Sequence, residues 1–366
     1  MSATEERRVG SDYLQWAKTR SGSRYNLTVS GLPYLSIHEL PVGLEDLELS
    51  GSGAYGWEPL QEAIAARYRV PMECVVSAQG TSMANHLALA ALAGPGCEVL
   101  AEHPTYEPIT AVARYVGATV TSFARRSEDR FRIDPDEVAR HVTPRTRVIA
   151  LTNLHNPSGA PTDDDTLRAI GRIAERVGAK VLVDEVYLDA LWESPPRTSF
   201  HLGPNFVVTS SLTKVYGLNG LRCGWVLADP QLAGRLWALN ELFSNIGAHP
   251  AERLGVVAFQ NLDRIAARSR SILAPNTAEL NDFYRRRPDL DVPEHRHGTV
   301  SFPRLCHGSV DELCTVLREK YETTVVPGAF FGMPDHFRIA LGTDPETFSE
   351  GLYRLSQALD EIGAAA

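Results

Sequence analysis

The feature that most constrains the fold is a regular alternation of short apolar runs with longer helical patterns between Cys74 and Ala228. The runs are rich in β-branched residues, as expected of strands that are buried on both faces of a mostly parallel sheet. The helical patterns between them are long enough to be the crossovers that parallel strands require. The alternation therefore predicts a three-layer α/β fold. The predicted strands are Cys74–Ser77, Glu98–Glu102, Thr119–Phe123, Val148–Thr152, Val181–Val183, Phe206–Thr209 and Gly224–Leu227.

After Pro230 the pattern changes to long helices followed by short strand-like runs, which indicates a smaller α+β domain. A chain of 366 residues is long enough for two domains. The first 40 or so residues carry no such alternation, and we expect them to pack with this second domain. The predicted elements are helices at Gln231–Phe243, at Glu252–Leu273 continuing toward Tyr284 and at Pro345–Ile362, and strands at Thr299–Phe302, Thr323–Val326 and Phe337–Ala340. We predict a large domain over residues 45–245 and a small domain made of residues 1–44 and 246–366.

Charge and composition argue against nucleic-acid and membrane partners. The 36 Lys and Arg residues against 45 Asp and Glu give a formal net charge of −9, which does not attract phosphate backbones or anionic lipids. The longest apolar run, Leu87–Ala93, is far shorter than the ~20 residues that span a bilayer. The charged start Met1–Arg8 lacks the apolar core of a signal peptide, and the five cysteines include no C-x-x-C pair. We therefore expect a cytoplasmic protein without a structural metal.

The most specific cluster of chemically active residues surrounds Lys214. A lysine that directly follows a buried strand is poorly hydrated and can lose its proton, as a lysine nucleophile must do to form a Schiff base. Ser211, Thr213 and Arg222 add two hydroxyls and a cation, a combination suited to a phosphate group. A lone lysine at a strand end is more often a surface residue, so these neighbours carry the functional interpretation.

Other polar residues follow the remaining predicted strands. Asp184 ends a strand buried on both faces, where a carboxylate is costly unless it meets a donor or a cation such as a pyridinium nitrogen. Tyr187 follows three residues later, and Asn156 lies in the turn after an earlier strand. Thr81 and Ser82 open a helix, where backbone amides and hydroxyls form an anion site, although simple capping of the helix is the alternative.

The positions of these residues point to a single site. Tyr106, which follows the strand at Glu98–Glu102, adds a flat ring that can stack on another ring. Open α/β sheets bind their ligands at the edge formed by the carboxyl ends of the strands. We therefore predict that the residues following the strands share one site at that edge: Thr81, Ser82, Tyr106, Asn156, Asp184 and Lys214.

From about Tyr25 to its C-terminus the sequence resembles the fold-type I, pyridoxal-phosphate-dependent aminotransferases of class I and II. The most specific part of the resemblance is Lys214 with Arg222 eight residues further on. The resemblance implies a fold-type I large domain, pyridoxal 5′-phosphate (PLP) as the cofactor and a homodimer with shared active sites. The implied reaction transfers the amino group of an L-amino acid to a 2-oxo acid.

The resemblance also implies a role for each matched residue. Lys214 would hold PLP as a Schiff base and move the proton, and Asp184 would pair with the pyridine nitrogen. Asn156 and Tyr187 would bind the phenolic oxygen of PLP, and Tyr106 would stack on its ring. The phosphate would be held by Thr81, Ser82, Ser211 and Arg222, with Thr213 beside them and Tyr55 reaching it from the other subunit. Arg338 would bind the substrate α-carboxylate, Asn156 would lie beside the substrate, and Gly31 would lie at the substrate mouth.

The sequence departs from the family pattern at three places. Leu154 stands where proline is usual, and Thr213 stands where serine is common, which preserves the hydroxyl. The segment Ser244–Pro250 contains no arginine where aspartate-specific members place one for a side-chain carboxylate. We therefore expect a neutral, aromatic or basic amino donor.

Several alternatives remain beside transamination. The same residues serve β-elimination, decarboxylation and oxidation, and a non-catalytic PLP-binding regulator would need a DNA-binding module for which the first 24 residues are too few. The segment Gly51–Gly56 spells the G-x-G-x-x-G of dinucleotide folds, but the residues before it are too charged for a central strand. His295 and His297 form an H-x-H pair without the further ligands that a metal site needs.

Overall fold

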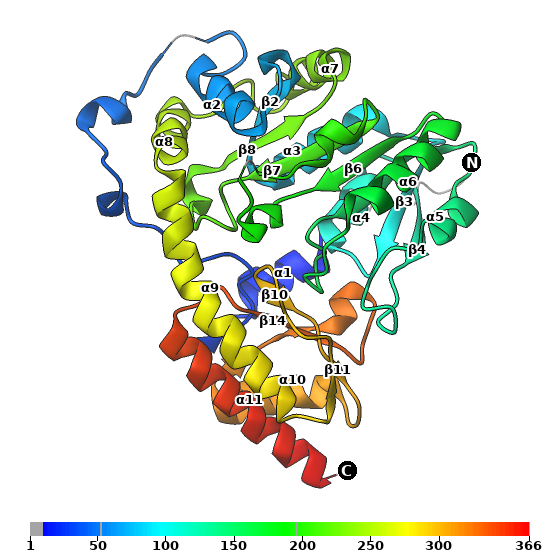
Figure 1. Cartoon of the computed structure of the whole chain (residues 1–366), viewed down its shortest axis with the longest axis vertical. Helices are drawn as coiled ribbons and strands as arrows, with labels where there is room; N and C mark the ends of the chain where they lie inside the picture. The colour runs from blue at the N-terminus through cyan, green and yellow to red at the C-terminus, as the bar shows by residue number, and fades with distance from the viewer. Residues whose placement is uncertain (1–9, 52, 195, 366) are drawn as a thin grey trace, which may run out of the picture.

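The computed structural model describes residues 10–51, 53–194 and 196–365, so that Met1–Arg8 and Ser52 lie outside the described residues. Its central feature is a seven-stranded sheet with the strand order β2-β8-β7-β6-β5-β3-β4 (Figure 1). Strand β8 runs antiparallel to both of its neighbours, and the other pairs are parallel. The predicted mostly parallel α/β sheet is thereby confirmed. The strands are β2 (Val75–Gln79), β3 (Glu98–His103), β4 (Thr119–Ala124), β5 (Thr146–Thr152), β6 (Lys180–Asp184), β7 (Phe206–Ser211) and β8 (Cys223–Leu227).

Helices cover both faces of this sheet because successive strand residues point to opposite sides. In β5, Val148 and Ala150 belong to one apolar cluster, whereas Ile149 and Leu151 belong to another. The first cluster packs under α3 (Gly80–Leu92), α4 (Glu107–Tyr115) and α7 (Pro230–Asn240). The opposite face is covered by α2 (Glu58–Tyr68), α5 (Pro135–His141), α6 (Asp164–Arg176) and α8 (His249–Gln260).

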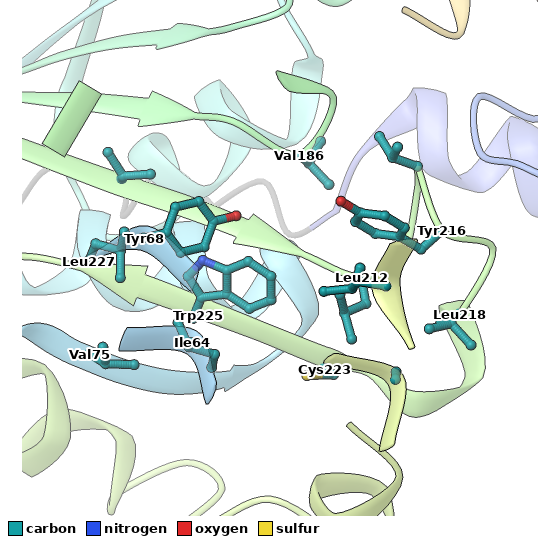
Figure 2. Packing of buried hydrophobic residues seen from close by; sticks show 14 of the residues in the cluster. Ile64, Tyr68, Val75, Val186, Leu212, Tyr216, Leu218, Cys223, Trp225 and Leu227 are labelled. Atoms are coloured by element: carbon teal, nitrogen blue, oxygen red, sulfur yellow. The ribbon is translucent and has the colours of Figure 1, made fainter. Parts of the chain in front are cut away.

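The largest apolar cluster lies where α2 and α8 meet the strands β7 and β8. Figure 2 shows the fully buried Trp225 with Tyr68 and Ile64 packed close to it. The same cluster contains Ala258 of α8 and Ile265 of the following helix. These helices therefore fix the end of the sheet from which the Lys214 loop emerges.

The C-terminal part forms a second layered unit below the sheet in Figure 1. A three-stranded antiparallel sheet places β14 (Phe337–Ala340) between β10 (Val300–Ser301) and β13 (Val326–Pro327). Two separate two-stranded sheets belong to the same part of the molecule, β1 (Tyr25–Asn26) with β12 (Thr323–Thr324) and β9 (Leu290–Asp291) with β11 (Arg304–Leu305). The helices of this part are α9 (Leu262–Arg285), α10 (Val310–Tyr321) and α11 (Pro345–Ala365), and the N-terminal helix is α1 (Asp12–Thr19).

The N-terminal segment joins this second unit. Strand β1 runs parallel to β12, and Leu27 and Leu32 enter the same apolar cluster as Phe337 and Leu355. The described residues contain no helix that is long and apolar enough to cross a membrane. The domain boundaries after residues 44 and 245 stay a prediction.

One predicted helix is wrong in its extent. The sequence predicts a continuous helix from Glu252 toward Tyr284, but the structure has two helices, α8 and α9, with a break at Asn261. The Asn261 side-chain amide donates to the backbone oxygen of Val257 at 2.8 Å. Such a side-chain bond to the backbone competes with the regular helical bonds, and apolar periodicity does not reveal it.

Candidate active site

The polar residues predicted to share a site lie along one edge of the central sheet. The parallel strands β2, β3, β5, β6 and β7 all end at this edge, and the antiparallel strand β8 begins there. This geometry places the residues that follow the strand ends on the same side of the sheet. They are Thr81, Ser82, Tyr106, Asn156, Asp184, Tyr187, Lys214 and, just before β8, Arg222.

Lys214 lies in the loop after β7, partly buried under the N-terminal segment. Its Nζ donates to Ser30 Oγ at 3.3 Å, and its backbone oxygen accepts from the backbone amide of Leu32 at 2.8 Å. Removal from water lowers the pKa of Lys214, and the cation of Arg338 lowers it further, while Asp184 opposes the shift. A lowered pKa increases the fraction of neutral amine, which is the nucleophilic form.

Asp184 is buried at the end of β6, with 3% of its surface exposed. Its Oδ2 accepts from Asn85 Nδ2 at 2.8 Å, and its Oδ1 accepts from the amide of Val186 at 3.0 Å. The carboxylate forms no ion pair within the described residues, and burial raises its pKa to about 6. A buried carboxylate with only neutral donors fits the pyridinium nitrogen that the family resemblance assigns to it.

A cradle of hydroxyls and one cation lies where β2 enters α3. Thr81 Oγ1 donates to Ser211 Oγ at 2.8 Å, and Ser211 Oγ donates to Thr213 Oγ1 at 2.9 Å. Gly80 has a φ of +75°, and a side chain at this position would collide with the Arg222 guanidinium. The backbone and the guanidinium thus approach each other closely, and together with the hydroxyls they provide the donors that a phosphate requires. The exposed Ser82 lies in the first turn of the same helix.

Arg338 is a fully buried cation in β14, so it extends into the site from the C-terminal unit of the molecule and not from the central sheet. Its Nη1 donates to Asn156 Oδ1 at 2.9 Å, while Nη2 donates to the hydroxyl of Tyr13 at 2.8 Å and to the backbone oxygen of Thr28 at 3.0 Å. It forms no ion pair within the described residues, and its Nε has no hydrogen-bond partner among them. A buried guanidinium without a carboxylate partner fits a bound carboxylate.

The aromatic residues divide into two groups. Burial raises the pKa of both Tyr106 and Tyr187, and the Tyr187 hydroxyl donates to Ser30 Oγ at 2.7 Å. Tyr106 meets the ring of Tyr13 edge-on at 5.9 Å between centroids. Tyr55 instead is 48% exposed and packs on Trp237 at 5.4 Å, away from the Lys214 loop of its own chain. The described chain therefore assembles all predicted site residues except Tyr55.

Gly31 lies directly against the lysine. A Cβ at this position would lie 3.4 Å from Lys214 Cδ, so any side chain here would be in van der Waals contact with the lysine. Gly31 thereby fixes how closely the N-terminal segment approaches the site.

Three residues of the site were not predicted from the sequence. Ser30 contacts both Lys214 and Tyr187, Tyr13 contacts Arg338, and Asn85 contacts Asp184. Asn85 lies four residues after Thr81 on α3, so helical spacing could have placed it on the same face. No local pattern marks Ser30 or Tyr13, because they reach the site from the N-terminal segment.

The rival dinucleotide interpretation is not supported by the geometry. The segment before Gly51–Gly56 contains a short 3-10 helix at Leu44–Leu47 rather than a strand that leads into the glycines. A dinucleotide loop requires that preceding strand. The H-x-H pair is likewise divided, because His295 is buried against Gly159 whereas His297 is exposed.

Comparisons with known proteins agree with this geometry. Residues 50–355 match the family model described as aminotransferase class I and II. The chain is 30% identical over 327 residues to capreomycidine synthase of Streptomyces vinaceus, covering 86% of this chain and 82% of that protein. A PLP-dependent aminotransferase from Streptococcus suis superposes with a TM-score of 0.89 at 24% identity, over 95% of this chain and 96% of the other. A PLP-dependent cyclase, OrfR, superposes with a TM-score of 0.87 at 25% identity, over 99% of this chain and 100% of the other.

Proposed function

The chain belongs to the class I and II aminotransferases, which use PLP, and from this premise we propose that Lys214, Asp184 and Arg338 divide the work of its reaction. The observation that carries the proposal is the convergence of an amine with a lowered pKa, a buried carboxylate and a buried guanidinium at one sheet edge. When bound, PLP supplies an aldehyde that takes up an amino group and a ring that stabilises negative charge at the α-carbon.

The residues of the site then have distinct tasks. Asp184 keeps the ring nitrogen protonated, because a carboxylate beside a pyridine nitrogen favours the charged form of the ring. Arg338 binds the α-carboxylate of the amino acid with the unpaired donor capacity of its guanidinium, beside Asn156. The neutral amine of Lys214 would take the proton from the substrate α-carbon and would release it away from that carbon, because a proton returned to the same carbon would regenerate the amino acid. The hydroxyls of Thr81 and Ser211 and the Arg222 cation hold the phosphate.

We further propose an amino donor without a side-chain carboxylate. The segment Ser244–Pro250 offers no arginine for a second carboxylate. The neighbourhood of Arg338 is aromatic, with its guanidinium 5.5 Å from the Tyr13 ring centroid and 5.3 Å from that of Phe331. Aromatic surfaces favour neutral, aromatic or cationic side chains over carboxylates. The acceptor is a 2-oxo acid.

A homodimer with shared sites accounts for the position of Tyr55. Several large apolar side chains are exposed in two parts of the chain, namely Tyr34 (74%), Leu44 (87%), Leu49 (83%) and Leu242 (79%). Exposed apolar groups of this size mark surfaces that contact another molecule. In such a dimer the exposed Tyr55 of one subunit would reach the phosphate of the other. We place the enzyme in the cytoplasm, in keeping with its five free cysteines.

Borohydride reduction of the purified enzyme with PLP tests the central assignment. A Schiff base at Lys214 would be reduced to a stable amine, so peptide mapping should find the cofactor mass on Lys214 and Lys214→Ala should carry no label. Label on another lysine would overturn the assignment. A panel of amino acids and 2-oxo acids, scored for amino transfer, then identifies the donor and the acceptor.

The likeness to a synthase and to a cyclase supports a second candidate, a different PLP-dependent reaction on an amino acid. Elimination, decarboxylation and oxidation start from the same residues, because each also requires a base at the α-carbon or a charged ring. The same product panel separates them. Ammonia, carbon dioxide or consumption of oxygen without a new amino acid from the 2-oxo acid would favour the second candidate over transamination.

A further inference from the structure

Ser30 occupies a central position in the site. Its side chain is 5% exposed, and its Oγ accepts from the Tyr187 hydroxyl at 2.7 Å and from Lys214 Nζ at 3.3 Å. Its backbone oxygen accepts from Thr299 Oγ1 at 2.7 Å, and Gly31 packs directly on the Lys214 side chain. The backbone around Ser30 is therefore fixed by the bond from Thr299 and by the contact of Gly31 with Lys214, and this fixes the position of the hydroxyl.

The hydrogen-bonding capacity of a serine hydroxyl determines what it can do there. A hydroxyl has two acceptor positions and one donor. Tyr187 and Lys214 use both acceptor positions of Ser30, so its own O–H is available to donate. When Lys214 loses a proton, the lone pair of Nζ becomes an acceptor, and Ser30 is already in contact with it. The same hydroxyl can thus bond to the amine in both protonation states.

We propose that Ser30 is a positioning residue of the amino-group transfer, one that holds the Lys214 ε-amine in its working position while the amine gains and loses a proton. The proposal rests on the proposed role of Lys214. Nζ would take up a proton from the substrate α-carbon and would release a proton again at a different atom before the half-reaction ends, so Ser30 reverses the direction of its hydrogen bond and undergoes no net change. Tyr187 fixes the orientation of the serine from the other side.

Ser30→Ala and Ser30→Val leave the other groups that act on the pKa of Lys214 chemically unchanged. They are Tyr13 from α1, Asp184 from β6, Arg222 before β8 and Arg338 from β14. Tyr187 bonds to the Ser30 hydroxyl itself. A change in the titration of Lys214 on loss of the serine hydroxyl is therefore attributable to that hydroxyl.

Matched variants separate the hydroxyl from the shape of the side chain. Ser30→Thr keeps the hydroxyl, and Ser30→Val has the same shape as threonine without it. Ser30→Ala removes the hydroxyl without adding any atoms to the side chain. Ser301→Ala is the control, because Ser301 is 2% exposed and likewise accepts from a tyrosine, the partly buried Tyr284, at 2.8 Å, but no contact joins it to Lys214 among the described residues.

The first measurement uses the enzyme without PLP. The rate of reductive methylation at Lys214, followed by peptide mass spectrometry across pH, reports the midpoint of its titration. The bond that Ser30 accepts from the charged ammonium is stronger than the bond that it donates to the neutral amine, so loss of the hydroxyl should move the midpoint to lower pH in Ser30→Ala and Ser30→Val. Ser30→Thr and Ser301→Ala should keep the native midpoint. Native midpoints in both variants that lack the hydroxyl would overturn the proposal.

The second measurement uses the loaded enzyme. We expect kcat to fall about tenfold to hundredfold in Ser30→Ala and Ser30→Val with little change in the donor KM, because a misplaced catalytic group costs rate on this scale. Ser30→Thr should recover most of the loss. An equal loss in Ser30→Thr and Ser30→Val would assign the effect to shape and overturn the proposal. Borohydride label on a lysine other than Lys214 in the native enzyme would instead overturn the proposed function itself.

Discussion

At the scale of single residues, Asp184 combines a cost in stability with a catalytic benefit. Burial raises its pKa to about 6 from the ordinary value of 3.8. A carboxyl group whose pKa is higher in the folded state lowers the free energy of unfolding of the protein as pH rises from about 4 to about 6. For a shift of this size the loss is about 3 kcal/mol. We expect Asp184→Ala to lower kcat by on the order of a hundredfold or more, since it removes the charge beside the ring. The variant lacks this carboxyl group, so the free energy of unfolding of the PLP-free variant should rise relative to that of the native PLP-free protein as pH increases across that window.

Chemical denaturation of both PLP-free proteins between pH 4 and pH 7 measures this difference. Glu185, whose pKa burial raises to about 7, is present in both proteins and contributes equally to both. A difference in unfolding free energy that does not change with pH would contradict the assignment of the titration to Asp184. Near-native kcat in Asp184→Ala would show that another group pairs with the ring.

Arg338 gives the second prediction at this scale. Each charge-assisted hydrogen bond to a bound carboxylate contributes about 1.5–3 kcal/mol. We therefore expect Arg338→Ala to lower kcat/KM about tenfold to a hundredfold or more, and to do so by a similar factor for every donor, because all donors share the α-carboxylate. Steady-state kinetics over a donor panel measures this. A native enzyme that prefers aspartate or glutamate more than tenfold would contradict the proposed donor class.

Most of the site was predictable because its residues follow the strands directly. Lys214, Asp184 and Asn156 each come within four residues of a strand end, and the parallel topology brings strand ends together. Ser30 and Tyr13 could not be predicted in this way. They contact Lys214 and Arg338 across 184 and 325 residues of sequence, respectively, and local periodicity carries no information on such approaches.

At the scale of elements, one buried cluster ties three strands together below the site. Glu102 at the end of β3 is fully buried, and its Oε2 pairs with Arg125 at 2.7 Å just after β4. Its Oε1 accepts the amide and the hydroxyl of Thr152 at the end of β5 at 2.7 and 2.6 Å. Thr152 Oγ1 in turn accepts from the backbone amide of Asn156 at 2.9 Å. The cluster therefore fixes the loop that carries Asn156.

Removing one partner of this buried pair should be strongly destabilising. We expect Glu102→Gln to lower the free energy of unfolding by about 3–5 kcal/mol, because it leaves the Arg125 cation buried without a counter-charge. The control Glu294→Gln breaks the exposed pair of Glu294 with Arg296 and should cost less than about 1 kcal/mol. Urea denaturation of the three proteins measures both values. Similar losses in the two variants would contradict the importance of burial.

At the scale of the whole molecule, the sequence predicts the class of fold but not the arrangement of its sheet. Apolar alternation locates each strand of the central sheet to within two residues at either end. In the smaller unit, the single strand predicted at Thr323–Val326 is wrong, because the structure divides it into β12 and β13, which pair with different strands. It does not reveal that β8 turns back between β2 and β7, because strand order depends on long-range pairing. That reversal places Arg222 beside Gly80 and so completes the cradle proposed for the phosphate.

The shared site of the proposed dimer leads to the last prediction. Lys214→Ala and Tyr55→Phe subunits should each form impaired homodimers, for they lack groups that act in the same site. In a hybrid dimer, one site combines the native Lys214 of one subunit with the native Tyr55 of the other. If the two kinds of subunit exchange randomly at equal amounts, half of the dimers are hybrids with one intact site each, so activity should recover to about a quarter of the native value. Lys214→Ala mixed with a Lys214→Ala/Tyr55→Phe double variant is the control, and no recovery is expected there because no native Lys214 is present. Activity that stays at the mean of the two parent variants after subunit exchange, or a fully active monomer in light scattering, would show that each chain builds its site alone.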